Sequence, residues 1–170
     1  MAEAPRVAEG FRPHAGAGPA GRGGVDDAMT TTTTATTTER EGGCLCGAVR
    51  YRITAEPVGP AYCHCRACQL SAGAPVMVWA DAPPGSFAWT KGEPRVYRSS
   101  ARGERLFCPD CGTQLAFRPL DEGPDRLEVN VVTLDDPSAT PPDHHSWVSS
   151  RLPWFDTSDS LPRHQEGQDG

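Results

Sequence analysis

Seven cysteines in three closely spaced groups constrain this chain more than any other feature of its sequence. The groups are Cys44 and Cys46; Cys63, Cys65 and Cys68; and Cys108 and Cys111. An odd number of cysteines argues against a closed set of disulfides. Reduced thiols at these short spacings are typical of zinc ligands. The sequence therefore predicts a zinc protein.

The first and last groups together predict one closed structural zinc site. Cys108 and Cys111 lie in the sequence Cys-Pro-Asp-Cys-Gly, a knuckle turn that points both sulfurs at one metal while Gly112 lets backbone N–H groups face the thiolates. In an extended segment, Cys44 and Cys46 project to the same side. These four residues, the four-cysteine group, make a Cys₄ set that would tie the start of the domain to its middle. The alternative is four free buried cysteines.

Cys63, Cys65 and Cys68, the three-cysteine group, remain as three ligands. Three protein ligands and an open fourth position are what a catalytic zinc requires, so we expect a second zinc ion here. Three thiolates around Zn²⁺ sum to a net charge of −1, which makes the metal a weak Lewis acid but a reasonable binder of a further thiolate. The group therefore favours a thiol substrate.

Two alternatives for the three-cysteine group stay open at this stage. A histidine could close the site as a second structural zinc, although an extended backbone turns His64 away from Cys63 and Cys65. His144 or His145 could instead reach the site from the tail of the chain. The second alternative is a redox-active thiol cluster without an open zinc.

Composition limits the remaining classes of function. The chain has 170 residues, 18 Gly, 17 Pro and 37% hydrophobic residues, which predicts one domain with a small core that needs a metal to stabilise it. A net charge of −6 disfavours nucleic-acid binding. Because no apolar run resembles a signal peptide or a membrane span, we expect a cytoplasmic protein without a membrane partner.

The chain divides into three parts by composition. Residues 1–40 are rich in Ala, Gly, Pro and Thr, and we expect them to be a disordered, low-complexity segment. Met29 stands before the Thr run, and we hypothesise that translation starts there rather than at Met1. Residues 41–163 should form the zinc-binding β domain, and residues 164–170 should be frayed.

Short segments between Gly and Pro turns predict an all-β fold. In residues 48–54, Val49, Tyr51 and Ile53 share one face, as in a half-buried strand. Further strands are expected at residues 76–79, 86–90, 95–99, 104–107, 113–117 and 127–131. Residues 56–60 should be a turn, residues 69–73 a single helical turn, and the chain from Pro137 irregular. The tryptophans, including Trp147 and Trp154 of the tail, are expected to be core residues.

The order C-x-C, C-H-C-x-x-C, C-P-x-C-G resembles the glutathione-dependent formaldehyde-activating enzyme family, which is related to the centromere protein V domain. The resemblance extends from about Gly42 to Pro162. Its further motifs are Gly43-Cys-Leu-Cys-Gly-Ala-Val-Arg-Tyr51, Phe107-Cys-Pro-Asp-Cys-Gly-Thr113, Thr133-Leu-Asp-Asp-Pro137, and Trp154 followed by Leu161-Pro162.

The resemblance implies a β-tent of stacked short antiparallel sheets with two zinc ions per chain. It implies a structural zinc on Cys44, Cys46, Cys108 and Cys111, and a second zinc on Cys63, Cys65 and Cys68. The implied reaction joins glutathione to formaldehyde as S-hydroxymethylglutathione, which is a carbon–sulfur lyase reaction run backwards. Glutathione is then the co-substrate, and the partners are a small-molecule thiol and an aldehyde.

The enzyme hypothesis leaves several roles open. The thiol would be the fourth ligand of the second zinc, and a proton for the new alkoxide could come from His64, His144 or His145. Arg66 could attract a carboxylate of a peptide thiol. The alternatives are a non-catalytic, zinc-scaffolded binding module and a redox-responsive thiol protein. The aldehyde, the thiol and the oligomeric state are not determined by the sequence.

Overall fold

A computed structural model describes residues 39–123 and 125–167 of the chain. The expectations for residues 1–38, including the start at Met29, lie outside the described residues. By its contacts the chain divides after Thr36, and all that follows concerns the unit that begins at Thr37. No helix in the described residues is long and apolar enough to cross a membrane.

The described residues form ten strands, one α-helix and three short 3₁₀ helices. The strands are β1 (Arg40–Gly43), β2 (Arg50–Ile53), β3 (Val58–Cys63), β4 (Met77–Ala82), β5 (Phe87–Lys91), β6 (Arg95–Ser100), β7 (Gly103–Phe107), β8 (Gln114–Pro119), β9 (Leu127–Asn130) and β10 (His144–Ser146). The helices are α1 (Arg66–Ala72), η1 (Val131–Thr133), η2 (Pro137–Ala139) and η3 (Val148–Ser150).

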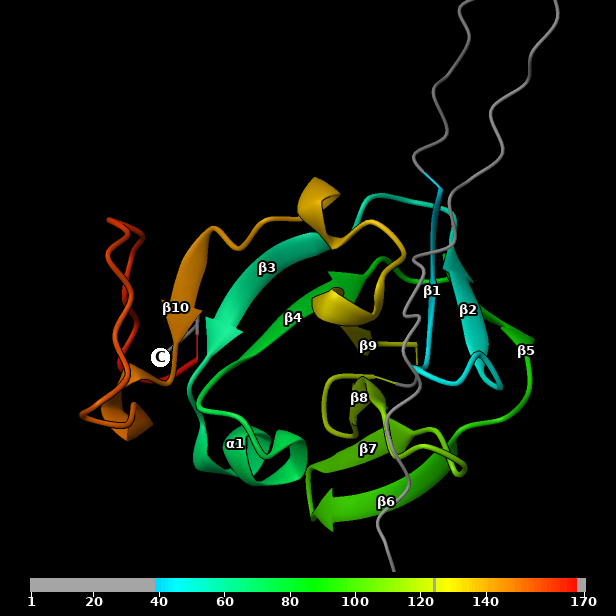
Figure 1. The fold of residues 1–170 in the computed structure, drawn as a ribbon, viewed down its shortest axis with the longest axis horizontal. Coiled ribbons are helices and arrows are strands. Elements are labelled where there is room, and N and C mark those ends of the chain that lie inside the picture. The colour runs from blue at the N-terminus through cyan, green and yellow to red at the C-terminus, as the bar shows by residue number, and fades with distance from the viewer. Residues whose placement is uncertain (1–38, 124, 168–170) are drawn as a thin grey trace, which may run out of the picture. The chain divides into compact units, whose positions relative to one another are not determined.

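The strands form two sheets, which confirms the all-β prediction. One sheet has three strands in the order β1-β2-β5, and the other has seven in the order β10-β3-β4-β9-β8-β7-β6. All of their pairings are antiparallel except β10 with β3, which is parallel. Figure 1 shows the three-stranded sheet on one side of the domain and β10 on the other, with α1 next to β3 and β4.

The main core lies between the two sheets. Tyr51 and Ile53 of β2 are almost fully buried, as the alternating sequence predicts, and they cluster with Val78 and Val129 of the larger sheet. Burying such a side chain contributes roughly 1.5–3 kcal/mol. The Tyr51 hydroxyl also hydrogen-bonds the Thr133 hydroxyl at 2.8 Å, which fixes η1 against β2.

The opposite face of the larger sheet carries a second, smaller cluster. Cys63 is paired with Met77, and Trp79 is paired with both Ala61 and Asn130, so these side chains share one face. Cys63, Cys68, Met77 and Trp79 form this cluster, with Cys65 and Phe117 packed against it. The cluster places the three-cysteine group away from the core between the sheets.

Several element predictions were wrong. The helix begins at Arg66 rather than Gln69, because the Cys65 side chain caps it by accepting from Cys68 N–H. Strand β3 starts inside the expected turn at 56–60, where Gly59 adopts a φ of 58° at an irregular register. The tail, which was expected to be irregular, contains strand β10. This strand pairs with β3, and no local sequence pattern predicts that pairing.

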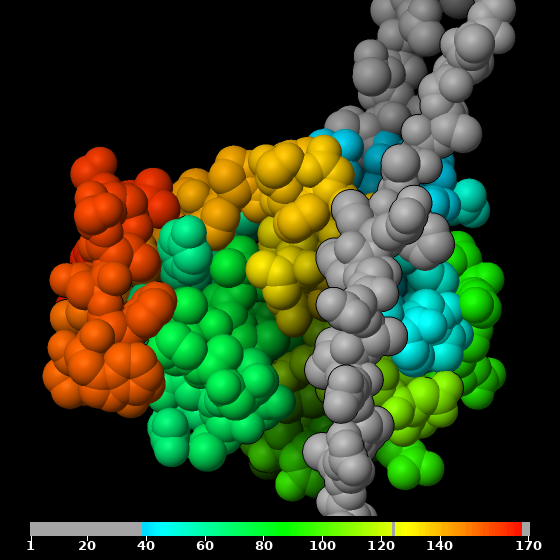
Figure 2. Space-filling model, viewed as in Figure 1, coloured from blue at the N-terminus to red at the C-terminus, as the bar shows by residue number. Residues whose placement is uncertain are grey.

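The end of the chain is attached differently from the prediction. Trp154 is 73% exposed and Trp147 39% exposed, so neither is a core residue. Backbone hydrogen bonds attach the tail instead: His164 N–H donates to the carbonyl of His145, and Trp147 N–H donates to that of Glu166. The prediction that the chain is frayed from His164 onward is therefore wrong for residues 164–166. Figure 2 shows these residues, orange to red, lying against the β3 side of the domain.

Candidate metal centre

The structure brings the four-cysteine group together from two loops, one between β1 and β2 and the other between β7 and β8. The four sulfur atoms lie within 4.8 Å of one another. The distance from Cys46 Sγ is 3.5 Å to Cys44 Sγ and 3.7 Å to Cys108 Sγ. Four thiolates around zinc, each about 2.3 Å from the metal, would place their sulfurs about 3.8 Å apart. The spacing of the sulfurs therefore fits zinc.

Two tight turns hold these sulfurs in place. Gly47 (φ 73°) follows Cys46 and Gly112 (φ 75°) follows Cys111, and both use the left-handed conformation that glycine adopts without strain. In the first turn, Val49 N–H donates to Cys44 Sγ at 3.2 Å. The turns are also connected to each other, because Leu45 N–H donates to the Thr113 hydroxyl. Backbone N–H donation to a cysteine sulfur, which the sequence predicted for the knuckle turn at Gly112, is thus found at Cys44 in the other turn.

The three-cysteine group has a different composition and setting. Its three sulfurs also lie within 4.8 Å of one another, and Cys63 Sγ is 3.6 Å from Cys68 Sγ. Cys63 and Cys68 are buried, whereas Cys65 is half-buried at the start of α1. All seven cysteines are free thiols. Among the described residues no histidine or carboxylate joins either group within that distance.

A buried arginine contacts the three-cysteine group. Arg105 of β7 is 7% exposed, and its two terminal nitrogens donate to Cys68 Sγ at 3.8 and 3.7 Å. Its guanidinium carbon lies 5.3 Å from the centre of the Phe117 ring, which fixes its orientation. Hydrogen bonds from Cys63 and Cys65, together with the Arg105 charge, lower the pKa of the Cys68 thiol. This arrangement favours a thiolate at Cys68.

Glu128 of β9 is an acidic group on the same face of the sheet. Phe117 of β8 is paired with Glu128 on one side and with Arg105 of β7 on the other. The side chains of these three residues therefore project from one face of the sheet. Burial, reinforced by the nearby Asp81 carboxylate, raises the pKa of Glu128 to about 7. This carboxyl group can therefore exchange a proton near neutral pH. No sequence pattern singled out either Arg105 or Glu128, since their neighbours come from distant strands.

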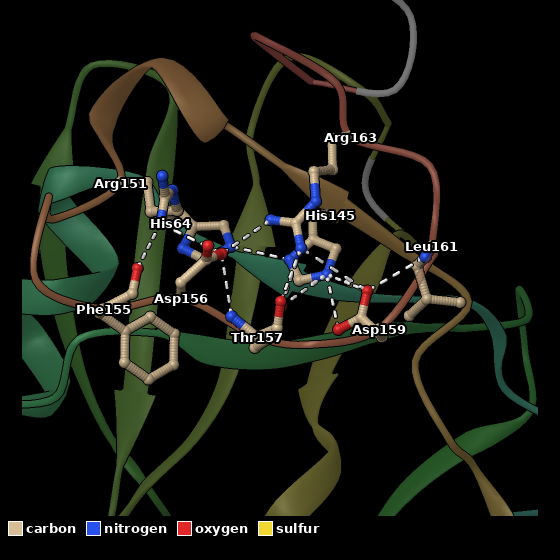
Figure 3. Close-up of polar contacts among 9 residues, drawn as sticks. All are labelled: His64, His145, Arg151, Phe155, Asp156, Thr157, Asp159, Leu161 and Arg163. Carbon is tan, nitrogen blue, oxygen red and sulfur yellow. Dashed lines mark hydrogen bonds and ion pairs between the residues drawn. The ribbon is translucent and has the colours of Figure 1, made fainter.

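His64 does not point toward the sulfurs of its neighbours. Its Nε2 lies 2.9 Å from His145 Nδ1, and the other nitrogen of His145 lies 3.1 Å from an Asp159 carboxylate oxygen (Figure 3). Because a carboxylate accepts, His145 carries its proton on Nε2, and His64 Nε2–H then donates to His145 Nδ1. Burial, with the adjacent His145, lowers the pKa of His64 to about 4.

His144 and Arg66 also contact residues outside the cysteine groups. His144 Nδ1 lies 2.6 Å from an Asp143 carboxylate oxygen. Arg66 donates to Gln69 Oε1, and the amide nitrogen of Gln69 in turn donates to the carbonyls of His64 and Ser150. The tail is therefore fastened to the loop that carries Cys63 and Cys65. An extended backbone predicts that His64 points away from Cys63 and Cys65, and the structure identifies its partner as His145.

The chain is similar to known proteins over most of the described residues. The family described as glutathione-dependent formaldehyde-activating enzyme matches residues 39–150. An uncharacterized lyase of Schizosaccharomyces pombe (strain 972 / ATCC 24843) is 34% identical over 79 residues, which are 46% of this chain and 57% of the relative. The match thus spans little more than half the length of that relative.

One solved structure is also similar. It is the crystal structure of a Rhodobacter sphaeroides protein, with a TM-score of 0.47 and 18% sequence identity over 73% of this chain and 98% of the other. The family match at residues 39–150 includes all seven cysteines. On the strength of that match, the chain belongs to the glutathione-dependent formaldehyde-activating enzyme family.

Proposed function

We propose that this protein is a zinc-dependent, lyase-type enzyme that joins a small-molecule thiol, glutathione or a close analogue, to formaldehyde or another small aldehyde. The observation that carries the proposal is the inequality of the two cysteine groups. One offers four sulfurs and is complete as a structural site; the other offers three, with an arginine on one of them and no fourth ligand within reach among the described residues.

Zinc held by Cys63, Cys65 and Cys68 would supply Lewis-acid chemistry, lowering the pKa of a substrate thiol that takes its fourth position. The protein's own residues prepare this site. Arg105 places a positive charge against Cys68 and offsets the excess charge of three thiolates. Trp79 and Met77 cover the group on the side of the sheet and keep it partly dry. A drier site strengthens each of these electrostatic interactions.

The proposed reaction balances without an oxidant or a reductant. The thiol sulfur forms a bond to the carbonyl carbon, the carbon–oxygen π bond breaks, and the proton lost by the thiol is regained at the oxygen. The product is a hemithioacetal, S-hydroxymethylglutathione when the substrates are glutathione and formaldehyde. The main contribution of the protein would be to hold the sulfur as a nucleophile beside the aldehyde.

The family's description and the lyase named in Schizosaccharomyces pombe support this proposal. The four-cysteine group, which we assign to a structural zinc, supports it indirectly, because a complete Cys₄ site has no position for a substrate. His64 and His145, two of the three histidines proposed as proton donors, are less suited, since His64 Nε2 and His145 Nδ1 are hydrogen-bonded to each other and His145 Nε2 is hydrogen-bonded to Asp159.

Exchange NMR on a mixture of glutathione and formaldehyde tests the proposed reaction. Sub-stoichiometric protein should increase the exchange rate above that of the spontaneous reaction. Cys65→Ser should abolish the excess, and because serine also caps helices, this variant keeps the hydrogen bond that starts α1. Arg102→Met, at an exposed ion pair with Asp121, is the control and should keep the full rate. No excess rate with a zinc-loaded protein would contradict the proposal.

A further inference from the structure

The indole nitrogen of Trp79 is a buried hydrogen-bond donor without a partner. Trp79, on β4, is 5% exposed, and among the described residues no group accepts a hydrogen bond from its Nε1. Buried polar groups in proteins nearly always have a partner, and a tryptophan N–H can only donate. The nitrogen has almost no accessible surface, so a ligand arriving from solvent does not reach it. Its acceptor is therefore expected among the buried groups of the protein itself.

Cys68 of α1 is the acceptor that the packing favours. Trp79 and Cys68 belong to one buried cluster, on the face of the larger sheet that carries the three-cysteine group. Hydrogen bonds from the other two cysteines of the group have the largest lowering effect on the pKa of the Cys68 thiol, and the Arg105 charge and the Trp79 N–H lower it further. The Trp79 N–H thus lies near the Cys68 sulfur without forming a hydrogen bond to it. A metal-bound thiolate is a stronger acceptor than a neutral thiol.

Phe117 of β8 supports both Trp79 and Arg105. The ring centroids of Trp79 and Phe117 are 6.5 Å apart, with their planes inclined by 55°. The guanidinium carbon of Arg105 lies 5.3 Å from the centre of the same Phe117 ring. In the sheet, β9 and β8 separate the strands that carry the two donors, β4 and β7. Donors from distant strands are therefore held beside one aromatic ring and near one sulfur.

The other two sulfurs of the three-cysteine group have fewer N–H donors. Cys65 Sγ accepts from the Cys68 N–H at 3.3 Å, and Cys63 Sγ accepts from no N–H group among the described residues. Cys68 Sγ accepts from both terminal nitrogens of Arg105 and lies near the Trp79 N–H as well. Donors to a ligand sulfur orient it and withdraw part of its charge. The three ligands are thus unequal.

We propose that Trp79 is a positioning residue that donates its indole N–H to the Cys68 thiolate when the three-cysteine group holds a metal. Together with Arg105 it orients Cys68 and removes part of the excess negative charge of three thiolates. The hydrogen bond does not depend on the proposed reaction. Its consequence for catalysis rests on the proposed function, because a less negative site binds a substrate thiolate more readily.

Proton–cadmium correlation NMR on the full-length protein loaded with ¹¹³Cd tests the hydrogen bond directly. Scalar coupling passes from ¹¹³Cd through a sulfur to a hydrogen-bonded N–H proton, so Trp79 Hε1 should correlate with the resonance of the three-cysteine group. The indole protons of the other three tryptophans should show no correlation. The Val49 N–H, which donates to Cys44 Sγ at 3.2 Å, is the internal positive control and should correlate with the resonance of the four-cysteine group.

Competition with a chromophoric chelator measures what the hydrogen bond contributes. Trp79→Phe keeps an aromatic ring and removes the N–H, and it should weaken zinc at the three-cysteine group about tenfold. Trp89→Phe is the matched control, since it makes the same change in the main core, where the ring packs on Tyr51 and Phe87. It should leave the affinity unchanged, and neither variant should alter zinc binding at the four-cysteine group.

Asn130 is the alternative acceptor. It is the cross-strand partner of Trp79, and its Oδ1 is also buried and unpaired. Its amide is held by donation from Nδ2 to the backbone carbonyl of Gln114 at 2.9 Å, and in that orientation Oδ1 does not accept from Trp79. A cadmium correlation from Val49 without one from Trp79 would overturn the proposal and leave Asn130 as the acceptor.

The remaining outcomes separate the positioning role from the proposed function. Equal zinc affinity in Trp79→Phe and Trp89→Phe would show that the N–H has no influence on the metal, and would overturn the positioning role. Acceleration of the glutathione reaction in that case would leave the enzyme proposal standing alone. Conversely, a Trp79 correlation and a tenfold loss of affinity in Trp79→Phe, without any acceleration by the wild type, would leave the positioning role in place and remove the proposed reaction.

Discussion

Arg105 lies against Cys68, with both terminal guanidinium nitrogens within 3.8 Å of the sulfur. The arginine comes from β7 and the cysteine from α1, so the contact depends on the folded sheet rather than on any local sequence. Groups that hydrogen-bond to metal ligands orient them and change the charge that the metal experiences. In this protein the arginine lies on the side of the metal centre where three thiolates would otherwise leave an excess of negative charge.

Arg105→Met should weaken zinc at the three-cysteine group by about 10–100-fold, the usual effect of removing a hydrogen-bonding neighbour of a metal ligand. Methionine keeps apolar contact with Phe117 and removes the charge. Competition with a chromophoric chelator measures the loss, and only one of two zinc ions should be affected. Arg105→Lys should recover part of the affinity. Equal affinity in the wild type and Arg105→Met would show that the contact has no influence on the metal.

The two cysteine groups should respond differently to the loss of one thiol. Cys108 is fully buried in the core between the sheets, so Cys108→Ser should remove the structural zinc and cooperative folding with it. Cys65→Ser should lose one zinc and keep a cooperative melt. Zinc content by elemental analysis and thermal unfolding by circular dichroism measure both. A native-like melt of Cys108→Ser would contradict the structural assignment.

Glu128 should make folding stability depend on pH. Its folded pKa, about 7, is raised above the ordinary 4.5 by burial and by Asp81, while Arg126 and Arg105 oppose the rise. Its contribution to stability is thus fully present below about pH 4.5 and is lost as the pH rises through 7. Between pH 5.5 and 8 the loss should be roughly 2 kcal/mol, at about 1.36 kcal/mol per pH unit.

Glu128→Gln isolates this contribution, because glutamine has the same shape and does not titrate. The difference in free energy of unfolding between wild type and variant should change by that amount between pH 5.5 and 8, in favour of the variant at the higher pH. Denaturant titrations of the zinc-loaded proteins measure it. A difference that is constant with pH would mean that the Glu128 carboxyl titrates normally.

His145 should stabilise the attachment of the tail far more than its neighbour His144. His145→Phe keeps a ring stacked on Tyr62 but leaves the buried His64 N–H without its acceptor, at a cost of about 1–3 kcal/mol. His144→Phe gives up a contact with Asp143, an exposed carboxylate that water can solvate, and should cost less than about 1 kcal/mol. Chemical denaturation of both variants makes the comparison, and equal losses would exclude a special role for the His64–His145 pair.

Much of the fold could be predicted from the sequence, because local patterns carry it. The alternation of Val49, Tyr51 and Ile53 predicts a half-buried strand, and all three side chains are buried. The cysteine spacings predict which sulfurs lie together, since Cys-x-Cys and Cys-Pro-Asp-Cys-Gly each fix two thiols through a turn of a few residues. In this respect the geometry of both cysteine groups agrees with the expectation, and their metal content stays a prediction.

The remainder depends on contacts between distant segments. Residues 95–105 contain several charged side chains, and nothing local in the sequence distinguishes Arg105 from the others. The register of β7 with β8 is what places Arg105 over Phe117. Strand β10 consists of three polar residues and lacks the alternation of apolar and polar side chains that predicts a strand. It forms because β3 is available as a parallel partner. Trp147 and Trp154 of the tail were expected to be core residues, yet both are exposed, and backbone hydrogen bonds and His145 hold the tail.

¹¹³Cd NMR of the cadmium-substituted protein tests most directly whether one cysteine group is a complete site and the other accepts a substrate sulfur. Two resonances are expected, one from a site with four sulfur ligands and one from a site with three. Adding glutathione should move only the second, toward the position of a four-sulfur site, and Cys65→Ser should remove that resonance alone. If both resonances stay unchanged on addition of a thiol, neither site accepts a substrate sulfur, and the proposed role of the three-cysteine group is wrong.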